Sequence, residues 1–78
     1  MFFREQKLLK LANLMKLTPA QTVWLPAAFD KAAGMAEMSH YRFYRHMEIN
    51  QELRDYIKDA IVRSSKNPAQ SVYTTPKF

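Results

Sequence analysis

Residues 51–64 carry the pattern that most constrains how this chain can fold. Apolar side chains recur there at i, i+3, i+4, i+7 and i+8, and they are Leu53, Tyr56, Ile57, Ala60 and Ile61. This period is typical of a helix with one buried face, so we expect these side chains in a core. The solvated face of the same helix is expected to carry Glu52, Arg54, Asp55, Lys58 and Asp59.

The first half of the chain also gives helix signals. Residues 2–17 are apolar on two flanks, which is typical of a helix held between two partners. Thr18 can cap a helix that begins at Pro19, because proline fits the first turn and a glutamine follows in the capping-box position. Pro26 cannot occupy a helix interior without a kink or break. We therefore expect a short helix to about Trp24 and a second start at Pro26.

Two further helices are predicted after the only glycine. Gly34 is expected to end its helix in the left-handed conformation, which glycine adopts without steric cost. Ser39 or Ala36 would open the next helix, running through Met47, and Asn50 would cap the helix over 51–64.

The predicted fold is therefore all-α, a small bundle of four to five short helices with a disordered C-terminal tail. Residues 1–63 would form a single domain, since 78 residues make one domain at most. Residues 64–78 have two prolines, many small polar residues and no helical period, so we expect a flexible tail. No strand pattern or internal repeat is visible.

The absence of cysteine excludes disulfides and thiolate metal sites. Stability must then come from helix packing or self-association, because a chain of this size buries only about 60% of its unfolded surface. We expect a cytoplasmic protein, and no membrane partner, since no apolar run approaches the length needed to span a bilayer.

Positive charge is concentrated at the two ends of the chain. The net charge is +5, and residues 1–16 and residues 63–78 each carry a net +3. Such a balance suits nucleic acid, an anionic membrane or an acidic protein.

Residue types that would support catalysis are sparse. His40 and His46 are six positions apart, so they point to roughly opposite sides of a helix and cannot form an i, i+4 metal pair. A single glycine cannot build a glycine-rich phosphate loop. We expect neither an enzyme, nor a metal site, nor a cofactor.

The run from Tyr41 to His46 is the strongest candidate for a binding surface. It holds three aromatic rings, two guanidiniums and an imidazole, and no acid lies between Glu37 and Glu48. The helical period predicts that Phe43, Tyr44 and Met47 face the core. The side chains then left for solvent are Tyr41, Arg42, Arg45 and His46, a set that suits a recognition helix on DNA.

Part of this region resembles a known family. Residues 39–47, followed by 50–53, resemble the junction between the third and fourth helices of tetracycline-repressor-type regulators, and residues 32–35 are similar to the end of helix two there. The resemblance covers about 20 of 78 residues, with three extra residues between Gly34 and Ser39. It implies a helix-turn-helix with Lys31 near a phosphate. The groove-facing residues that it implies are Ser39, His40, Tyr41, Arg42, Tyr44 and Arg45.

The leading hypothesis is a small basic DNA-binding protein that acts as an accessory transcriptional regulator of a mobile element. We expect a homodimer that reads two half-sites of double-stranded DNA. The expected contact residues are Lys31, Ser39, His40, Tyr41, Arg42, Arg45 and His46.

The alternative is a protein-interaction module, such as a small phage-type inhibitor or adaptor. Its anchors would be aromatic residues, with exposed methionines as an adaptable surface. The expected anchors are Trp24, Phe29, Tyr41, Phe43, Tyr73 and Phe78. Binding of single-stranded RNA by the same aromatic and basic run remains a third option.

Overall fold

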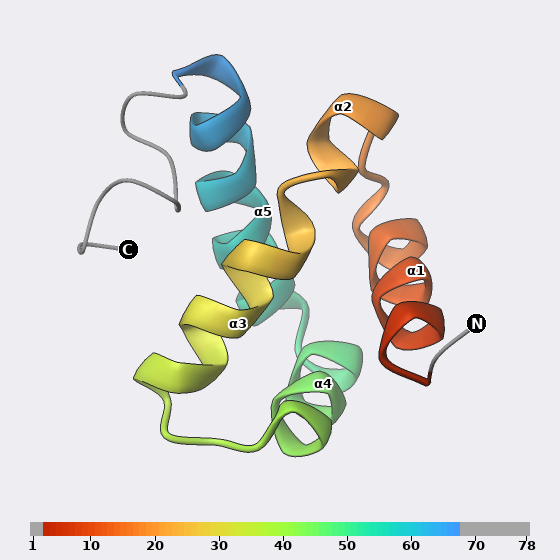
Figure 1. Ribbon diagram of the computed structural model, residues 1–78, viewed down its shortest axis with the longest axis vertical. Coiled ribbons are helices and arrows are strands. Elements are labelled where there is room, and N and C mark those ends of the chain that lie inside the picture. The colour runs from red at the N-terminus through yellow and green to blue at the C-terminus, as the bar shows by residue number, and fades with distance from the viewer. Residues whose placement is uncertain (1–2, 68–78) are drawn as a thin grey trace.

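The computed structural model describes residues 3–67, which form five helices and no strand (Figure 1). The all-α prediction is confirmed. The helices are α1 (Phe3–Met15), α2 (Pro19–Thr22), α3 (Leu25–Met35), α4 (His40–Ile49) and α5 (Gln51–Lys66). Tyr73 and Phe78, two of the expected anchors, lie outside the described residues. None of these five helices is long and apolar enough to cross a membrane.

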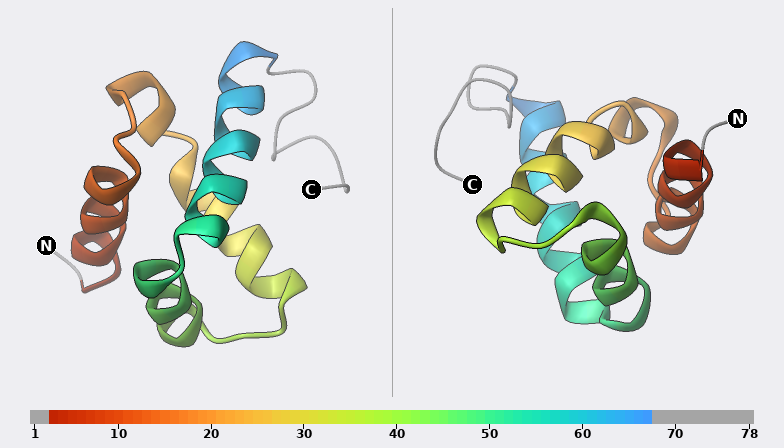
Figure 2. Two further views of the ribbon diagram at one scale, coloured as in Figure 1. Left: turned by 180° about the vertical axis from the view of Figure 1, so that it is seen from behind. Right: turned by 60° about the horizontal axis from the view of Figure 1, so that its bottom comes forward.

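Helix α5 is the central element, and it contacts each of the other four helices. It stands behind α3 in Figure 1 and comes to the front when the molecule is turned around in Figure 2. The side chains that are almost completely enclosed between these helices include Leu11, Leu25, Met47, Ile57 and Ile61. Each of α1, α3, α4 and α5 therefore contributes to one core.

The predicted helix starts at Pro19 and near Pro26 are confirmed. The Thr18 hydroxyl accepts a hydrogen bond from the Gln21 amide at 3.2 Å, and the Gln21 side chain accepts one from the Thr18 amide at 3.0 Å. Helix α2 has only four residues, and α3 begins at Leu25 with Pro26 in its first turn. Each proline therefore stands where its missing amide hydrogen is not required.

The predicted role of Gly34 is wrong. Gly34 does not adopt a positive φ, and the left-handed residue after α3 is Glu37, with φ 55°. The Met38 amide donates to the Ala33 carbonyl at 3.0 Å and the Glu37 amide to the Gly34 carbonyl at 3.1 Å. This pair of bonds is the Schellman motif that satisfies the last carbonyls of a helix. Sequence reasoning placed the turn three residues too early because it assumed that glycine must occupy it.

The same motif ends α1, where Lys16 has φ 55°. The Leu17 amide donates to the Ala12 carbonyl and the Lys16 amide to the Asn13 carbonyl, both at 3.1 Å. Both helices therefore end at a left-handed residue that carries a long charged side chain.

Two expectations for α5 need correction. Tyr56 is 53% exposed, so the core face is narrower than the apolar pattern indicated. The helix continues to Lys66, and Ser64 is only 1% exposed, so the folded domain extends past the predicted boundary at residue 63.

Arg54 and Lys58 were expected on a solvated face, but both are half-buried and hold helix ends. The Arg54 guanidinium donates to the carbonyls of Met47 and Glu48, each at 2.8 Å, in the last turn of α4. The Lys58 ammonium donates to the Met15 carbonyl at the end of α1, at 2.8 Å. A cation at a helix C-terminus meets both unpaired carbonyls and the negative end of the helix dipole. One turn of α5 thereby joins α4 and α1 to the centre of the bundle.

Candidate functional site

Helix α4 is fixed at both ends by side-chain caps. The Ser39 hydroxyl accepts a hydrogen bond from the Arg42 amide at 3.2 Å, so Ser39 rather than Ala36 opens the helix. At the other end, the Asn50 side chain accepts from the Leu53 amide at 3.1 Å and starts α5. The helix ends at Ile49, two residues beyond the predicted end at Met47.

The inner side of α4 is buried, as the helical period predicted. Phe43, Tyr44 and Met47 are between 0% and 3% exposed, and the ring of Phe43 meets the ring of Phe29 edge to face, with centroids 5.4 Å apart. The outer side carries Tyr41, which is 58% exposed, together with the exposed side chains of Arg42 and Arg45.

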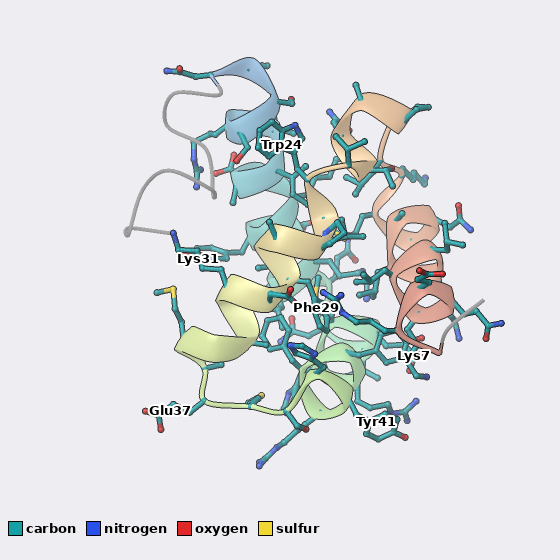
Figure 3. The ribbon with its side chains drawn as sticks, viewed as in Figure 1. Lys7, Trp24, Phe29, Lys31, Glu37 and Tyr41 are labelled. Carbon is teal, nitrogen blue, oxygen red and sulfur yellow. The ribbon has the colours of Figure 1, made fainter. Side chains whose placement is uncertain are left out.

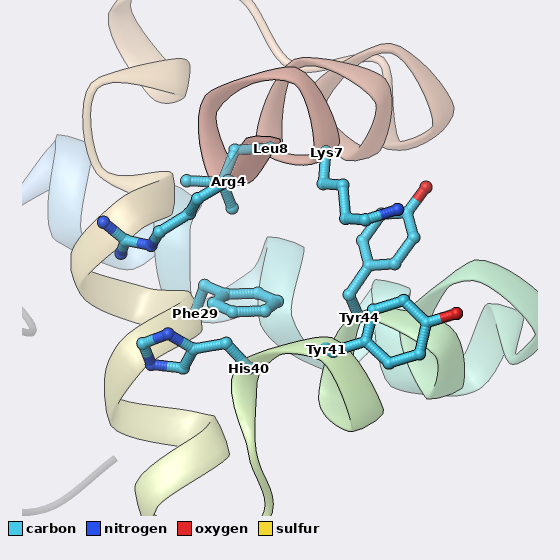
Figure 4. Close-up of a pocket in the computed structure, with 7 residues that line it drawn as sticks. All are labelled: Arg4, Lys7, Leu8, Phe29, His40, Tyr41 and Tyr44. Carbon is cyan, nitrogen blue, oxygen red and sulfur yellow. The ribbon is translucent and has the colours of Figure 1, made fainter. Parts of the chain in front are cut away.

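Two lysines of α1 lie beside this part of α4. The Lys7 ammonium is 4.3 Å from the centroid of the Tyr44 ring and 5.5 Å from that of the Tyr41 ring (Figure 4). Such a position over aromatic faces stabilises a cation. Sequence reasoning missed this contribution, because no local pattern reveals which helix packs against α4.

Glu48 connects α1 to α4. Its carboxylate accepts hydrogen bonds from the Tyr44 hydroxyl at 3.0 Å and the Arg45 guanidinium at 2.6 Å, and it lies 2.9 Å from the Lys10 ammonium. The bond from Lys10, followed by that from Tyr44, lowers the pKa of Glu48. The pKa of Lys10 is raised by the same carboxylate. Burial, with the hydrogen bond to Glu48, raises the pKa of the Tyr44 hydroxyl.

A second carboxylate, Asp30 of α3, holds two neighbouring side chains. It lies 2.5 Å from the Arg4 guanidinium and 3.3 Å from Nε2 of His40. The His40 ring also packs edge to face on Phe29, with centroids 5.6 Å apart. His40 therefore connects α3 to the start of α4, while 55% of its side chain remains exposed.

We define the α1–α4 face by the cations that surround these contacts and by Tyr41. It consists of Arg4, Lys7, Lys10, Tyr41, Arg42 and Arg45, with the carboxylates of Asp30 and Glu48. Five cations and two carboxylates give this face a net charge of +3. The single acid of α1, Glu5, lines a separate groove with Leu9 and Pro26.

Several predicted site residues are not brought to this face. Lys31 is half-buried and lies on the opposite side of α3 from Lys7 and Tyr41 (Figure 3). His46 is half-buried at the corner between α4 and α5, where Glu52 and Asp55 make the surroundings acidic.

The anchors expected for a protein partner are also dispersed. Phe29 and Phe43 are 2% and 3% exposed, so both belong to the core and cannot serve as surface anchors. Trp24 is half-buried and packs against the core at a distance from Tyr41 (Figure 3). Of this set, only Tyr41 presents most of its side chain within the described part of the chain.

Within residues 3–67, no group of three or more acids and histidines could hold a metal ion. A small pocket of about 80 Å³ opens in the α1–α4 face, between α1, α3 and α4. No family model, curated protein or solved structure matches this chain.

Proposed function

We propose that the protein binds double-stranded DNA through the α1–α4 face, with the outer side of α4 entering the major groove. The observation that carries this proposal is that α4 directs most aromatic side chains of the run 41–46 into the core and its two arginines to the outside. The rings of Phe43 and Tyr44 are buried, while Arg42 and Arg45 are exposed on the outside.

The chemistry of the outer side suits base and phosphate contacts. Arginine can donate two parallel hydrogen bonds to a guanine edge in the major groove, and it also pairs with phosphates. Ser39 and the first turn of α4 offer a hydroxyl and a helix N-terminus, which both suit a phosphate. The net charge of +3 on the face would attract the backbone and release counterions on binding.

The connection between α3 and α4 supports a helix-turn-helix reading. Residues 36–39 join the two helices, and turns of three to four residues are common in this motif. On this reading, α3 would cross the backbone while α4 lies in the groove. This agrees with the resemblance to tetracycline-repressor-type regulators, and a role as a transcriptional regulator is part of the proposal.

A homodimer is part of the same proposal. Helix α4 has 10 residues, which corresponds to a length of about 15 Å at about 1.5 Å per residue. Such a helix covers only about four base pairs at about 3.4 Å each. A two-fold dimer would read two half-sites and gain the missing specificity. Light scattering after size exclusion, with and without duplex, measures the stoichiometry.

The test is fluorescence anisotropy with a labelled duplex of mixed sequence at low salt. The double variant Arg42→Ala/Arg45→Ala should weaken binding at least tenfold and reduce the salt slope by about 2. The matched control Arg63→Ala/Lys66→Ala removes the same charge from the exposed end of α5, distant from α4 (Figure 1). It should change affinity less than threefold.

Two results would contradict the proposal. One is the absence of binding by the unmodified protein at low salt. The other is an equal loss in both double variants, because this would show that total charge, and not α4, determines the affinity. Circular dichroism of each variant establishes that the helices remain folded.

A further inference from the structure

The pocket in the α1–α4 face has almost completely apolar walls. Leu8 and Phe29 form one side, and the rings of Tyr41 and Tyr44 form the other (Figure 4). Leu8 is 9% exposed and Phe29 is 2% exposed, so this side belongs to the packed core. The other side combines the buried Tyr44 with Tyr41, which is 58% exposed. The pocket is therefore formed by side chains of the helices α1, α3 and α4, and none of the described loop residues lines it.

The mouth of the pocket is cationic. Lys7 lies on the tyrosine side, and Arg4 and His40 line the pocket from the other side (Figure 4). Asp30 pairs with both Arg4 and His40, so it offsets part of the charge on that side. A ligand for this site should therefore combine a small apolar group with a negative charge placed toward Lys7.

The volume limits the size of the apolar group. The pocket holds about 80 Å³, and a dry protein cavity of about 150 Å³ accommodates one benzene molecule. Half of that volume suits three or four carbon atoms, which is the size of the branched end of a leucine side chain. A phenyl or indole ring is too large to enter completely.

The small volume of the pocket also argues against a free small organic acid as its ligand. Burial of three or four carbons supports only about millimolar affinity, before the cost of immobilising the ligand. An acidic peptide segment could add contacts with Lys10, Arg42 and Arg45 on the surrounding face. Charge complementarity over that net positive surface favours a polypeptide with acids beside its apolar anchor.

We propose that this pocket receives one leucine side chain from an acidic segment of a protein partner. The leucine end fills the space between Leu8, Phe29 and Tyr44, and carboxylates on either side of it lie over Lys7 and Lys10. This inference rests on the pocket and its rim, so it is independent of whether α4 enters DNA.

The probes are three synthetic peptides of nine residues with capped ends and a fluorescent label. The first has a central leucine flanked by aspartates and glutamates, the second has alanine in place of leucine, and the third has glutamines and asparagines in place of the acids. We expect the first peptide to bind with a submillimolar dissociation constant. The second and third should each bind at least tenfold more weakly.

A pair of lysine variants, one on α1 and one in the turn that follows it, tests the site within the protein. Lys7→Gln removes the positive charge at the mouth of the pocket and should weaken the binding of the first peptide at least threefold. Lys16→Gln is the matched control, because Lys16 is exposed in the turn that ends α1 and does not line the pocket. In amide NMR spectra, the first peptide should shift the signals of Leu8, Phe29 and Tyr44.

Three results overturn the inference: no binding of the first peptide, equal binding of the leucine and alanine peptides, or amide shifts centred on Leu9 and Thr22, in the separate groove, instead of the pocket. Equal binding would show that charge alone attracts the peptide. The DNA proposal is tested separately by Arg42→Ala/Arg45→Ala on duplex, so failure of one proposal leaves the other intact.

Discussion

The turn between α3 and α4 allows a sharp test of the fold, because the only glycine and the left-handed residue occupy different positions. Glu37 has φ 55°, a conformation that costs a residue with a Cβ about 1–2 kcal/mol. Replacement by glycine removes this cost but adds about 0.5–1 kcal/mol of backbone entropy to the unfolded chain. We expect Glu37→Gly to raise the free energy of unfolding by about 0.5–1 kcal/mol.

Gly34 gives the complementary half of the experiment. It lies inside α3, and an added Cβ would meet no atom within 4 Å. Gly34→Ala should therefore stabilise the protein by about 0.5–1 kcal/mol, the difference in helix propensity between these residues. The swapped variant Gly34→Ala/Glu37→Gly keeps one glycine and places it where φ is positive.

Urea unfolding followed by circular dichroism measures these changes. Each stabilised variant should show a melting temperature higher by about 2–8 °C and a urea midpoint higher by about 0.5–1 M. Glu37→Ala is the control, since it removes the carboxylate near a helix C-terminus but keeps the Cβ. It should gain only about 0.3 kcal/mol from the dipole. If Glu37→Ala stabilises as much as Glu37→Gly, the conformational reasoning is refuted and only charge matters.

Three other outcomes are expected. The pKa of Glu48 is lower in the folded protein than in the unfolded chain, where it is about 4.3, so ionised Glu48 stabilises the fold above that pH. This contribution is lost as the pH falls through the lower folded-state pKa. Glu48→Gln should therefore make the urea midpoint fall less steeply between pH 7 and pH 3. Arg54→Met should cost about 1–2 kcal/mol in urea unfolding because it leaves carbonyls of α4 unpaired, whereas Arg63→Met removes an exposed pair with Asp59 and should cost less than about 0.5 kcal/mol. Asn50→Ala should cost about 1 kcal/mol in the same assay by removing the cap of α5.

Local chemistry made most of the helices predictable. The capping box at Thr18, the caps at Ser39 and Asn50, and the break before Pro26 depend on residues within a few positions of one another. The burial of the inner side of α4 followed from its period. The wrong prediction for Gly34 has a physical cause. The Schellman turn requires one left-handed residue at the end of the helix, and packing elsewhere can place a residue with a Cβ at that position.

Contacts between distant segments were not predictable in the same way. The bond from Lys58 to the Met15 carbonyl joins residues 43 positions apart, and that from Arg4 to Asp30 joins residues 26 positions apart. Nothing in the sequence indicates that Lys58 or Arg4 has a partner, because helix packing determines which distant residue each one meets. The packing of α1 on α4 also places the lysines of α1 and Glu48 in the candidate site. No sequence pattern connected Glu48 to Lys10.

These contacts decide how the positive charge of the chain can be used. Arg54 and Lys58 satisfy helix carbonyls, so they contribute to the total charge but are not available to a polyanion without loss of stability. Arg45 is paired with Glu48 but remains 56% exposed, so exchange of its carboxylate partner for a phosphate leaves Lys10 and Tyr44 to hold Glu48 in place. A ligand that competes for Arg45 thus leaves the connection between α1 and α4 intact. Among the exposed cations of α4, Arg42 has no such partner in residues 3–67, and for this reason we expect it to respond first to any anionic surface.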